Sequence, residues 1–492
     1  MNNQEHGSKL YLAAIVMVAV LGGLLFGYDT AVISGAEKGL QAFFLGASDF
    51  QYSDFMHGFT SSSALIGCII GSGLSGLFAG KFGRKRSLIF AGICFFISAW
   101  GSMEPETFGL LPYGKPTWSL LIVFNLYRIL GGIGVGMASA ICPMYIGEIA
   151  PSNIRGMLVS FNQFAIIFGQ LVVYFVNFLI LGDHTNPIIE SIGQGFSAVM
   201  PGSDPWTITT GWRYMFGSEC VPAGLFTILI CFVPETPRYL VMTGRDTKAL
   251  QILTRINGIK VAQQTINDIR NTMTEKTEKL FSFGFMCVFV GIMLSVFQQT
   301  VGINAVLYYA PRIFTDMGMA NPMMQTVIMG VVNISFTLVA VFTVEKLGRK
   351  PLLISGSIGM AIGAFGVALT FGNDSLSTIT MLSIMVYSAS FMFSWGPICW
   401  VYMAELFPNT IRSSATAIAV AFQWIFNFIV SSTFVPMFNM HLTKGDDFGH
   451  WFTYGLYGVI CVIAALFVWK LVPETKGKTL EDMTKLWRER KK

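Results

Sequence analysis

The sequence predicts an all-α membrane protein with about twelve transmembrane helices in two pseudo-symmetric six-helix bundles. Three observations support this fold class, namely the composition, the spacing of apolar runs and an internal repeat. The chain has 492 residues, of which 53% are hydrophobic and 12% are charged, and its mean hydropathy is +0.60. Because soluble domains carry about 25% charged residues, this composition excludes an ordinary soluble protein.

The apolar runs are close to the length of about 20 residues that a helix needs to cross a bilayer. The predicted spans are 10–35, 58–80, 87–103, 118–142, 156–181 and 212–233, followed by 282–314, 322–344, 351–371, 379–404, 412–438 and 450–471. The first run is not expected to be a signal peptide, since little positive charge precedes it and no A-x-A cleavage site follows it.

Three motifs occur twice in the same order, at a separation of roughly half the chain. They are Lys81-Phe-Gly-Arg-Lys85 with Lys346-Leu-Gly-Arg-Lys350, Glu148-Ile-Ala-Pro-Ser-Asn-Ile-Arg155 with Glu405-Leu-Phe-Pro-Asn-Thr-Ile-Arg412, and Pro234-Glu-Thr236 with Pro473-Glu-Thr475. A chance match of all three is not expected, so the repeat indicates two homologous halves.

The predicted organisation has four parts. An N-terminal six-helix bundle (1–233) is joined by a polar helical linker (234–281) to a C-terminal six-helix bundle (282–471), and a tail (472–492) follows. Basic residues gather in the loops at 81–86 and 346–350, so the positive-inside rule places the linker and both termini in the cytoplasm.

One carboxylate, Asp29, lies within the first predicted span. A charge in hydrocarbon costs at least several kcal/mol, so an intramembrane acid is by default a functional residue that needs a partner. Arg128 in 118–142 is identified as the only other strong intramembrane charge of the first half, and is therefore the expected partner. A fixed buried ion pair adds little stability over apolar packing, so we favour a proton-coupling pair over a structural one.

Several motifs carry a resemblance to a known family. They are Gly83-Arg-Lys85, Gly348-Arg-Lys350, Tyr127-Arg-Ile-Leu-Gly-Gly132, Pro234-Glu-Thr-Pro-Arg238, Gln298-Gln-Thr-Val-Gly-Ile-Asn304, Tyr308-Tyr309 and Pro473-Glu-Thr-Lys-Gly477. Over nearly its whole length the chain resembles the sugar porter family of the major facilitator superfamily, and within it the bacterial D-xylose–proton symporters. The resemblance implies import of a monosaccharide with a proton by alternating access, in which two bundles rock about a central site.

Neutral amides and aromatic rings within the spans suit a sugar, because amides both donate and accept hydrogen bonds and flat rings cover the C–H faces of the ring. Single amides can instead hold membrane helices together, but their clustering in the fifth, seventh and eleventh spans favours a binding site. Gln163 and Gln170 are two helical turns apart and share a face. A break is expected at Gly302, and another at Gly396-Pro397, just before Trp400.

The predicted substrate-binding residues are Gln163, Gln170, Gln298, Gln299, Asn304, Trp400 and Gln423. The resemblance implies polar contacts for all of them except Gln170, and implies that Gln170 lines the pocket together with Phe26, Ile166, Tyr308, Phe391, Gly396 and Trp424. In the aligned halves, Gly27-Tyr-Asp29 corresponds to Gly302-Ile-Asn304, so we hypothesise that proton and sugar occupy pseudo-symmetric positions that differ by one substitution.

Charged residues at the cytoplasmic ends of the spans form a predicted latch that closes the inner face in one state. Its members are Arg84, Glu148, Arg155, Glu235, Arg238, Arg349, Glu405, Arg412 and Glu474. Within it, Glu148 is expected to act with Arg155 and Glu405 with Arg412, because each carboxylate precedes its arginine by seven positions. Lys81, Lys85 and Lys350 are interpreted as topology signals.

No enzyme motif, cofactor site or metal site is predicted, because the five histidines (6, 57, 184, 441 and 450) are expected at the N-terminus or in outer loops. The expected partners are a monosaccharide, a proton and membrane lipid near the basic tail, with no nucleic acid. We expect a monomer in a bacterial inner membrane. Two alternatives are a facilitative uniporter, which has no need of Asp29, and a non-transporting sugar sensor, which usually carries a longer signalling segment.

Overall fold

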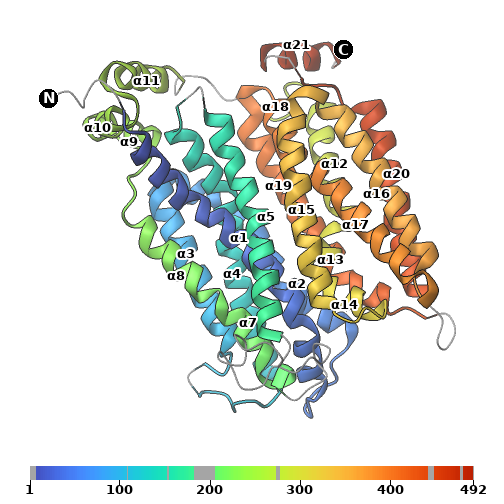
Figure 1. The fold of residues 1–492 in the computed structure, drawn as a ribbon. Coiled ribbons are helices and arrows are strands. Elements are labelled where there is room, and N and C mark those ends of the chain that lie inside the picture. The colour runs from blue at the N-terminus through green and yellow to red at the C-terminus, as the bar shows by residue number, and fades with distance from the viewer. Residues whose placement is uncertain are drawn as a thin grey trace.

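The computed structural model describes residues 7–107, 109–151, 154–181, 206–272, 278–441, 448–476 and 480–490. Within these ranges the regular elements are helices, without a strand. Figure 1 shows two bundles side by side, α1–α8 and α12–α20, with the helices of the linker and of the tail at one end of the molecule. The predicted fold class is therefore confirmed.

The first bundle and the linker follow each other in the chain. The bundle consists of α1 (Lys9–Leu45), α2 (Asp54–Phe82), α3 (Arg84–Met103), α4 (Trp118–Ile149), α5 (Arg155–Leu181), the π-helical turn η1 (Thr207–Gly211), α7 (Trp212–Ser218) and α8 (Cys220–Ile230). The linker forms α9 (Pro237–Met242), α10 (Asp246–Asn257) and α11 (Ile259–Thr272).

The second bundle repeats this arrangement with more interruptions. It consists of α12 (Phe285–Thr300), α13 (Ile303–Tyr308), α14 (Ala310–Asp316), α15 (Pro322–Leu347), α16 (Arg349–Thr370), the 3₁₀ turn η2 (Asp374–Leu376), α17 (Ser377–Phe393), α18 (Trp395–Leu406), α19 (Asn409–Phe438) and α20 (Phe448–Leu471). The tail forms α21 (Leu480–Arg490).

Eleven of the twelve predicted spans are observed as long apolar helices, with differences at their ends and with interruptions. In the described chain, 11 helical segments are long and apolar enough to cross a membrane. The sixth predicted span falls short because it is divided at Glu219 into α7 and α8. The first span is longer than predicted, since α1 continues past Glu37 and Lys38 to Leu45. The prediction ended the span before these two charges. Both form ion pairs in the structure, so the helix can continue through them.

The seventh and tenth spans are broken, as predicted, although the second break lies earlier than expected. Gly302 separates α12 from α13 with a φ of +88°. The tenth span breaks at Ser394, and Pro397 lies in the first turn of α18, where its missing N–H is tolerated. The backbone carbonyls of Trp395 and Gly396 lie in the same first turn of α18, where each also accepts a hydrogen bond from Gln298 of α12.

Replacing Gly302 by alanine is expected to destabilise the protein by about 2–6 kcal/mol, because two costs add. Left-handed backbone strains a non-glycine residue by about 1–3 kcal/mol, and overpacking costs about 1–3 kcal/mol more. A Cβ at this position would lie 2.4 Å from the Tyr457 ring. Thermal unfolding in detergent measures the loss.

The matched control for this change is Gly318→Ala. Gly318 also has a positive φ, of +73°, but nothing lies within 4 Å of the added Cβ. We expect a smaller loss of thermal stability for Gly318→Ala than for Gly302→Ala. Equal losses for the two variants would show that the contact with Tyr457 does not matter.

The two bundles meet mainly at the end of the molecule opposite the linker. We call the end that carries α9–α11 and α21 the linker face, and the opposite end the outer face (Figure 1). At the outer face, Lys38 lies 3.5 Å from Asp316 and Glu37 lies 3.3 Å from Arg312, and both pairs cross between the bundles. The ion pairs found at the linker face, in contrast, join helices of the same bundle. The structure is therefore closed at its outer face.

Candidate functional site: a central cavity beside a buried ion pair

A cavity lies between the two bundles, with an empty volume of about 640 Å³ that is partly open to solvent. The structure brings all thirteen predicted substrate-binding and pocket residues to this cavity. Its lining residues are Phe26, Thr30, Gln163, Ile166, Ile167, Gln170, Gln298, Gln299, Asn304, Leu307, Tyr308, Phe391, Met392, Gly396, Trp400, Gln423, Trp424 and Asn427.

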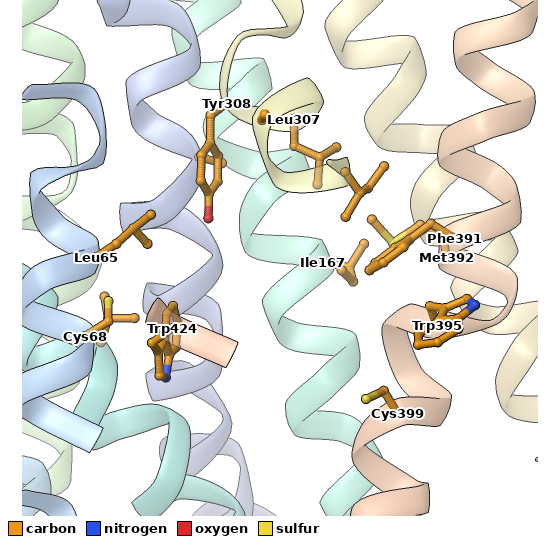
Figure 2. Packing of buried hydrophobic residues seen from close by; sticks show 14 of the residues in the cluster. Leu65, Cys68, Ile167, Leu307, Tyr308, Phe391, Met392, Trp395, Cys399 and Trp424 are labelled. Carbon is orange, nitrogen blue, oxygen red and sulfur yellow. The ribbon is translucent and has the colours of Figure 1, made fainter. Parts of the chain in front are cut away.

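Both bundles contribute to the lining, and aromatic and apolar side chains face one another across it. Figure 2 shows Tyr308 and Trp424 on one side and Ile167, Phe391 and Met392 on the other. The ring of Phe26 from α1 lies 5.5 Å from the ring of Trp424 in α19, so the two bundles touch at this level. The arrangement offers flat apolar faces from both halves to one ligand.

The glutamines of the cavity are held by hydrogen bonds to the broken helices. Gln298 donates from Nε2 to the carbonyl oxygens of Trp395 and Gly396, at 3.0 and 3.3 Å. The same side chain accepts a 2.6 Å hydrogen bond from Gln423 Nε2. Asn304 Nδ2 donates to Gln299 Oε1 at 2.6 Å. The first turn of α18 therefore positions Gln298, which in turn positions Gln423.

Some polar atoms of the cavity residues have no protein partner. Among the described residues, Gln170 Oε1, Gln423 Oε1 and Trp424 Nε1 are buried and form no hydrogen bond. Unpartnered buried polar atoms are uncommon in proteins and call for an explanation. Two acceptors and one donor beside apolar rings are the complement of a small molecule that carries hydroxyl groups.

Five lining residues were not predicted, and two of them are polar. Thr30 lies four positions after Phe26, and Asn427 lies four positions after Gln423, so each shares a helix face with a predicted residue. Extending the predicted face by one helical turn would have found both. The other three, Ile167, Leu307 and Met392, are apolar and carry no distinguishing signal in the sequence.

The predicted partners Asp29 and Arg128 are in direct contact. Arg128 Nη1 lies 2.6 Å from Asp29 Oδ1, and Arg128 Nη2 donates to the Asp29 carbonyl oxygen at 3.2 Å. Asp29 is fully buried and Arg128 is 2% exposed. The second carboxylate oxygen of Asp29 has no hydrogen-bond partner in the described chain. The ion pair with Arg128 therefore occupies one of the two carboxylate oxygens of Asp29.

The prediction that Arg128 is the only other strong intramembrane charge of the first half is wrong. Glu219, at the division between α7 and α8, is fully buried, and Asp29 and Arg128 are the charged groups that act on it. Its carboxyl group faces the carboxyl group of Asp29, and neither of its oxygens accepts from an N–H group among the described residues. Glu37 and Arg213 are further buried charges of this half. The sequence signal for Glu219 was an acid within the predicted span 212–233.

The two halves repeat the same polar contacts at the linker face. Arg84 pairs with Glu148 at 2.7 Å in the first half, and Arg349 pairs with Glu405 at 2.8 Å in the second. Glu235 accepts from the backbone N–H groups of Arg84 and Lys85, and Glu474 does the same for Arg349 and Lys350. Each carboxylate thus lies at a helix N-terminus, where negative charge is favoured.

The two capping carboxylates differ in their protonation behaviour. Burial raises the pKa of the Glu235 carboxyl above its ordinary value, although backbone N–H groups and Arg84 act in the opposite direction. Burial acts on Glu474 as well, but hydrogen bonds from four backbone N–H groups outweigh it and lower its pKa. The repeat is therefore structurally close but not electrostatically identical.

Three predicted members of the latch lie apart from these contacts. Arg155 and Arg238 are exposed, with no ion pair among the described residues. Arg412 donates to the carbonyl oxygen of Phe407 at 3.3 Å. In this structure Glu148 and Glu405 pair with the arginines at the start of α3 and α16, and not with the arginines seven positions further on.

The predicted location of the histidines needs correction. His57 lies in α2 and is fully buried, and His450 lies in α20. His441 follows α19, while His6 and His184 lie outside the described residues. Within the part of the chain that the structure describes, no group of His, Cys, Asp and Glu side chains could hold a metal ion.

Comparison with known proteins agrees with this geometry. Residues 15–487 match the family of sugar (and other) transporters. The chain is 47% identical over 500 residues to the D-xylose-proton symporter of Escherichia coli strain K12, covering 99% of this chain and 97% of that protein. It is 35% identical over 495 residues to the glucose facilitated diffusion protein of Zymomonas mobilis, covering 99% and 100% of the two proteins.

Solved structures give the same result. A partially occluded inward-open conformation of the xylose transporter XylE from E. coli matches with a TM-score of 0.82 and 45% identity, over 96% of this chain and 100% of that chain. These relatives are transporters and not enzymes, which confirms that expectation. The chain therefore belongs to the sugar transporter family of the major facilitator superfamily.

Proposed function

We propose that this chain is a proton-coupled monosaccharide symporter that works by alternating access, with D-xylose as its expected substrate. The observation that carries the proposal is the juxtaposition of a cavity lined by amides and aromatic rings with a buried cluster of ionisable groups. Phe26 and Thr30 line the cavity on α1, and Asp29 lies between them on the same helix. One helix thus connects the sugar site with the proton site.

The charge balance of the cluster supports proton binding. Asp29 and Glu219 supply two buried negative charges, whereas Arg128 supplies one positive charge. A buried cluster with an uncompensated charge is costly, so one proton shared by the two carboxyl groups neutralises it. Loss of that proton changes which arrangement of the two bundles has the lower free energy.

The latch at the linker face has a proposed part in the same cycle. Arg84, Glu148, Glu235, Arg349, Glu405 and Glu474 brace each half while the two halves stand apart at that end. Arg155, Arg238 and Arg412 are candidates for contacts between the halves when the linker face closes. Two of them are exposed, and within the described part of the chain Arg412 donates to a backbone carbonyl and forms no ion pair. In this proposal the structure is an inward-facing state.

The cellular placement follows from the charges of the loops. We propose that the linker face is cytoplasmic, since it carries the basic loops at 81–86 and 346–350. The membrane is then a bacterial inner membrane, as implied by the bacterial relatives. The same proposal includes three further points. Residues 234–281 form a linker and 472–492 a tail, the protein is a monomer, and the basic tail contacts anionic lipid.

A facilitative uniporter is the second candidate, and it is favoured by the similarity to the glucose facilitated diffusion protein. It predicts sugar exchange without a response to a pH gradient. The buried acids Asp29 and Glu219 argue against it, because an uncoupled carrier has no use for titratable groups beside its substrate site. A non-transporting sensor predicts binding without exchange.

Counterflow in proteoliposomes tests these candidates. Vesicles that contain the purified chain are loaded with unlabelled D-xylose, and the uptake of labelled D-xylose, L-arabinose and D-glucose is measured with and without an outside-acid pH gradient. We expect labelled D-xylose to exchange into loaded vesicles without a gradient, and to accumulate above the external concentration in unloaded vesicles with one. Exchange that ignores the gradient supports the uniporter, and absence of exchange overturns transport.

A further inference from the structure

A second buried titratable cluster lies at the outer face, far along α1 from Asp29. Its centre is Glu37, which is fully buried. One carboxylate oxygen, Oε2, accepts from His57 Nε2 at 2.9 Å and from Arg312 Nη1 at 3.3 Å. His57 belongs to the first bundle and Arg312 to the second. Glu37 is therefore shared between a partner in its own bundle and a partner across the interface.

The surrounding groups come from every element packed against this centre. On the first bundle they are Lys38, Gln41, Tyr52 and Asp54, and on the second bundle they are Tyr309, Arg312, Asp316 and Asn439. Asn439 links Arg312 to Asp54, with distances of 3.4 and 2.9 Å. The cluster supplies the polar contacts that close the outer face, and we call it the outer gate.

His57 can be neutral or charged without losing a hydrogen bond. Its Nδ1 lies 3.2 Å from the hydroxyl oxygen of Tyr52. In the neutral ring, Nε2–H donates to Glu37 and Nδ1 accepts from Tyr52, whereas in the charged ring both nitrogens donate. The site therefore accommodates a proton with no rearrangement of its own partners. The free energy of adding that proton depends on the charges around His57.

That consequence depends on whether the gate is closed. In the closed gate Arg312 already compensates Glu37, and a proton on His57 adds a second cation next to the same carboxylate oxygen. When the bundles separate at this face, the first bundle keeps Glu37 and Asp54 with only Lys38 to balance them. A protonated His57 supplies the missing positive charge at the buried Glu37. Separation of the bundles also removes Asp316 from Lys38. This change affects His57 less than the loss of Arg312, because Lys38 and Asp316 are more exposed than Glu37.

We propose that His57 is a second proton-binding site of this chain, and that a proton bound there favours opening of the outer gate. By linkage, opening of the gate draws a proton onto His57 from the outer solution, and acid on that side favours the open gate. An importer with this device exposes its sugar site outward more often when protons are abundant there. The inference rests on the alternating-access function proposed above.

The test measures the gate directly, without sugar or a pH gradient. Spin labels at Leu45 and Met440, which are exposed at the outer ends of the two bundles, report the distance across the gate in lipid nanodiscs. The accessible thiols Cys220 and Cys231 are first replaced by alanine. Asp29→Asn and Glu219→Gln remove the two buried acids beside Arg128, so that a pH dependence that disappears with His57 reports the outer gate.

We expect the population with the longer distance to rise as the pH falls from 8 to 5.5, by up to about tenfold per pH unit, the limit for one proton. His57→Gln and Glu37→Gln are each expected to abolish this dependence. The matched control is His450→Gln, because His450 packs between Phe371 and Phe438 within one bundle. That variant is expected to keep the full dependence.

Two results would overturn the proposal, namely a gate that ignores pH while His57 is present, and a pH dependence that survives His57→Gln. The outcome is separable from the proposed function. A pH-dependent gate in a chain that fails the counterflow test contradicts only the transport proposal, whereas counterflow with a pH-insensitive gate contradicts only the role of His57.

Discussion

Asp29→Asn is expected to abolish uphill accumulation of sugar while leaving sugar exchange in place. The substitution keeps the size of the side chain and a hydrogen-bond acceptor for Arg128, which lies 2.6 Å from Oδ1. It removes the group that takes up and releases the proton. Without that group the free energies of the two bundle arrangements no longer depend on the proton gradient, and only downhill or exchange transport remains.

The size of this effect follows from the gradient. A proton gradient of one pH unit is worth about 1.4 kcal/mol, which supports about a tenfold accumulation if one proton accompanies each sugar. The variant is expected to reach equal concentrations on both sides. Measurement of the steady-state ratio of labelled D-xylose in vesicles, with counterflow measured on the same preparation, gives both quantities.

The matched control is Asp268→Asn, which makes the same chemical change on an exposed position of α11. It is expected to accumulate sugar like the parent chain. If Asp29→Asn still accumulates sugar, another residue must couple the proton to transport. Glu219, the other buried acid beside Arg128, would be the first candidate. Loss of exchange together with accumulation would instead indicate a damaged carrier.

Gln298→Ala is expected to weaken sugar binding by about 100-fold or more. Gln298 satisfies the carbonyl oxygens of Trp395 and Gly396 and accepts from Gln423. Alanine removes the proposed contact with the sugar, leaves Gln423 Nε2 without its acceptor and takes one hydrogen bond from each of the two carbonyl oxygens. Each unsatisfied buried group costs about 1–3 kcal/mol, and a total of about 3 kcal/mol corresponds to a factor of about 100 in affinity.

The measurement is sugar affinity by tryptophan fluorescence, since Trp400 and Trp424 line the same cavity. Thermal unfolding of the same samples separates weakened binding from loss of the fold. Gln251→Ala deletes an identical side chain at an exposed position of α10 and is expected to bind like the parent. An affinity within about twofold of the parent for a folded Gln298→Ala would contradict the assignment of Gln298 to the sugar site.

The transmembrane organisation could be predicted from the sequence because its signals are local or periodic. Apolar length sets the spans, basic loops set a common face, and repeated motifs set the two halves. The amides of the cavity could also be predicted, since polar side chains are rare enough in spans to stand out. The correspondence between Gly27-Tyr-Asp29 and Gly302-Ile-Asn304 is weaker support for pseudo-symmetric proton and sugar positions. The reason is that α1 is continuous at Asp29, whereas the seventh span is broken beside Asn304.

What the sequence determined by itself is therefore the fold class, the two halves, the face shared by the loops and most of the cavity. What only the tertiary structure decided is which charges meet. Glu148 contacts Arg84 and not Arg155, Glu219 joins Asp29 and Arg128, and Glu37 lies between His57 and Arg312. The physical reason is that the partner of a buried charge depends on the rotation and register of packed helices, and those relations join residues that are distant in the chain.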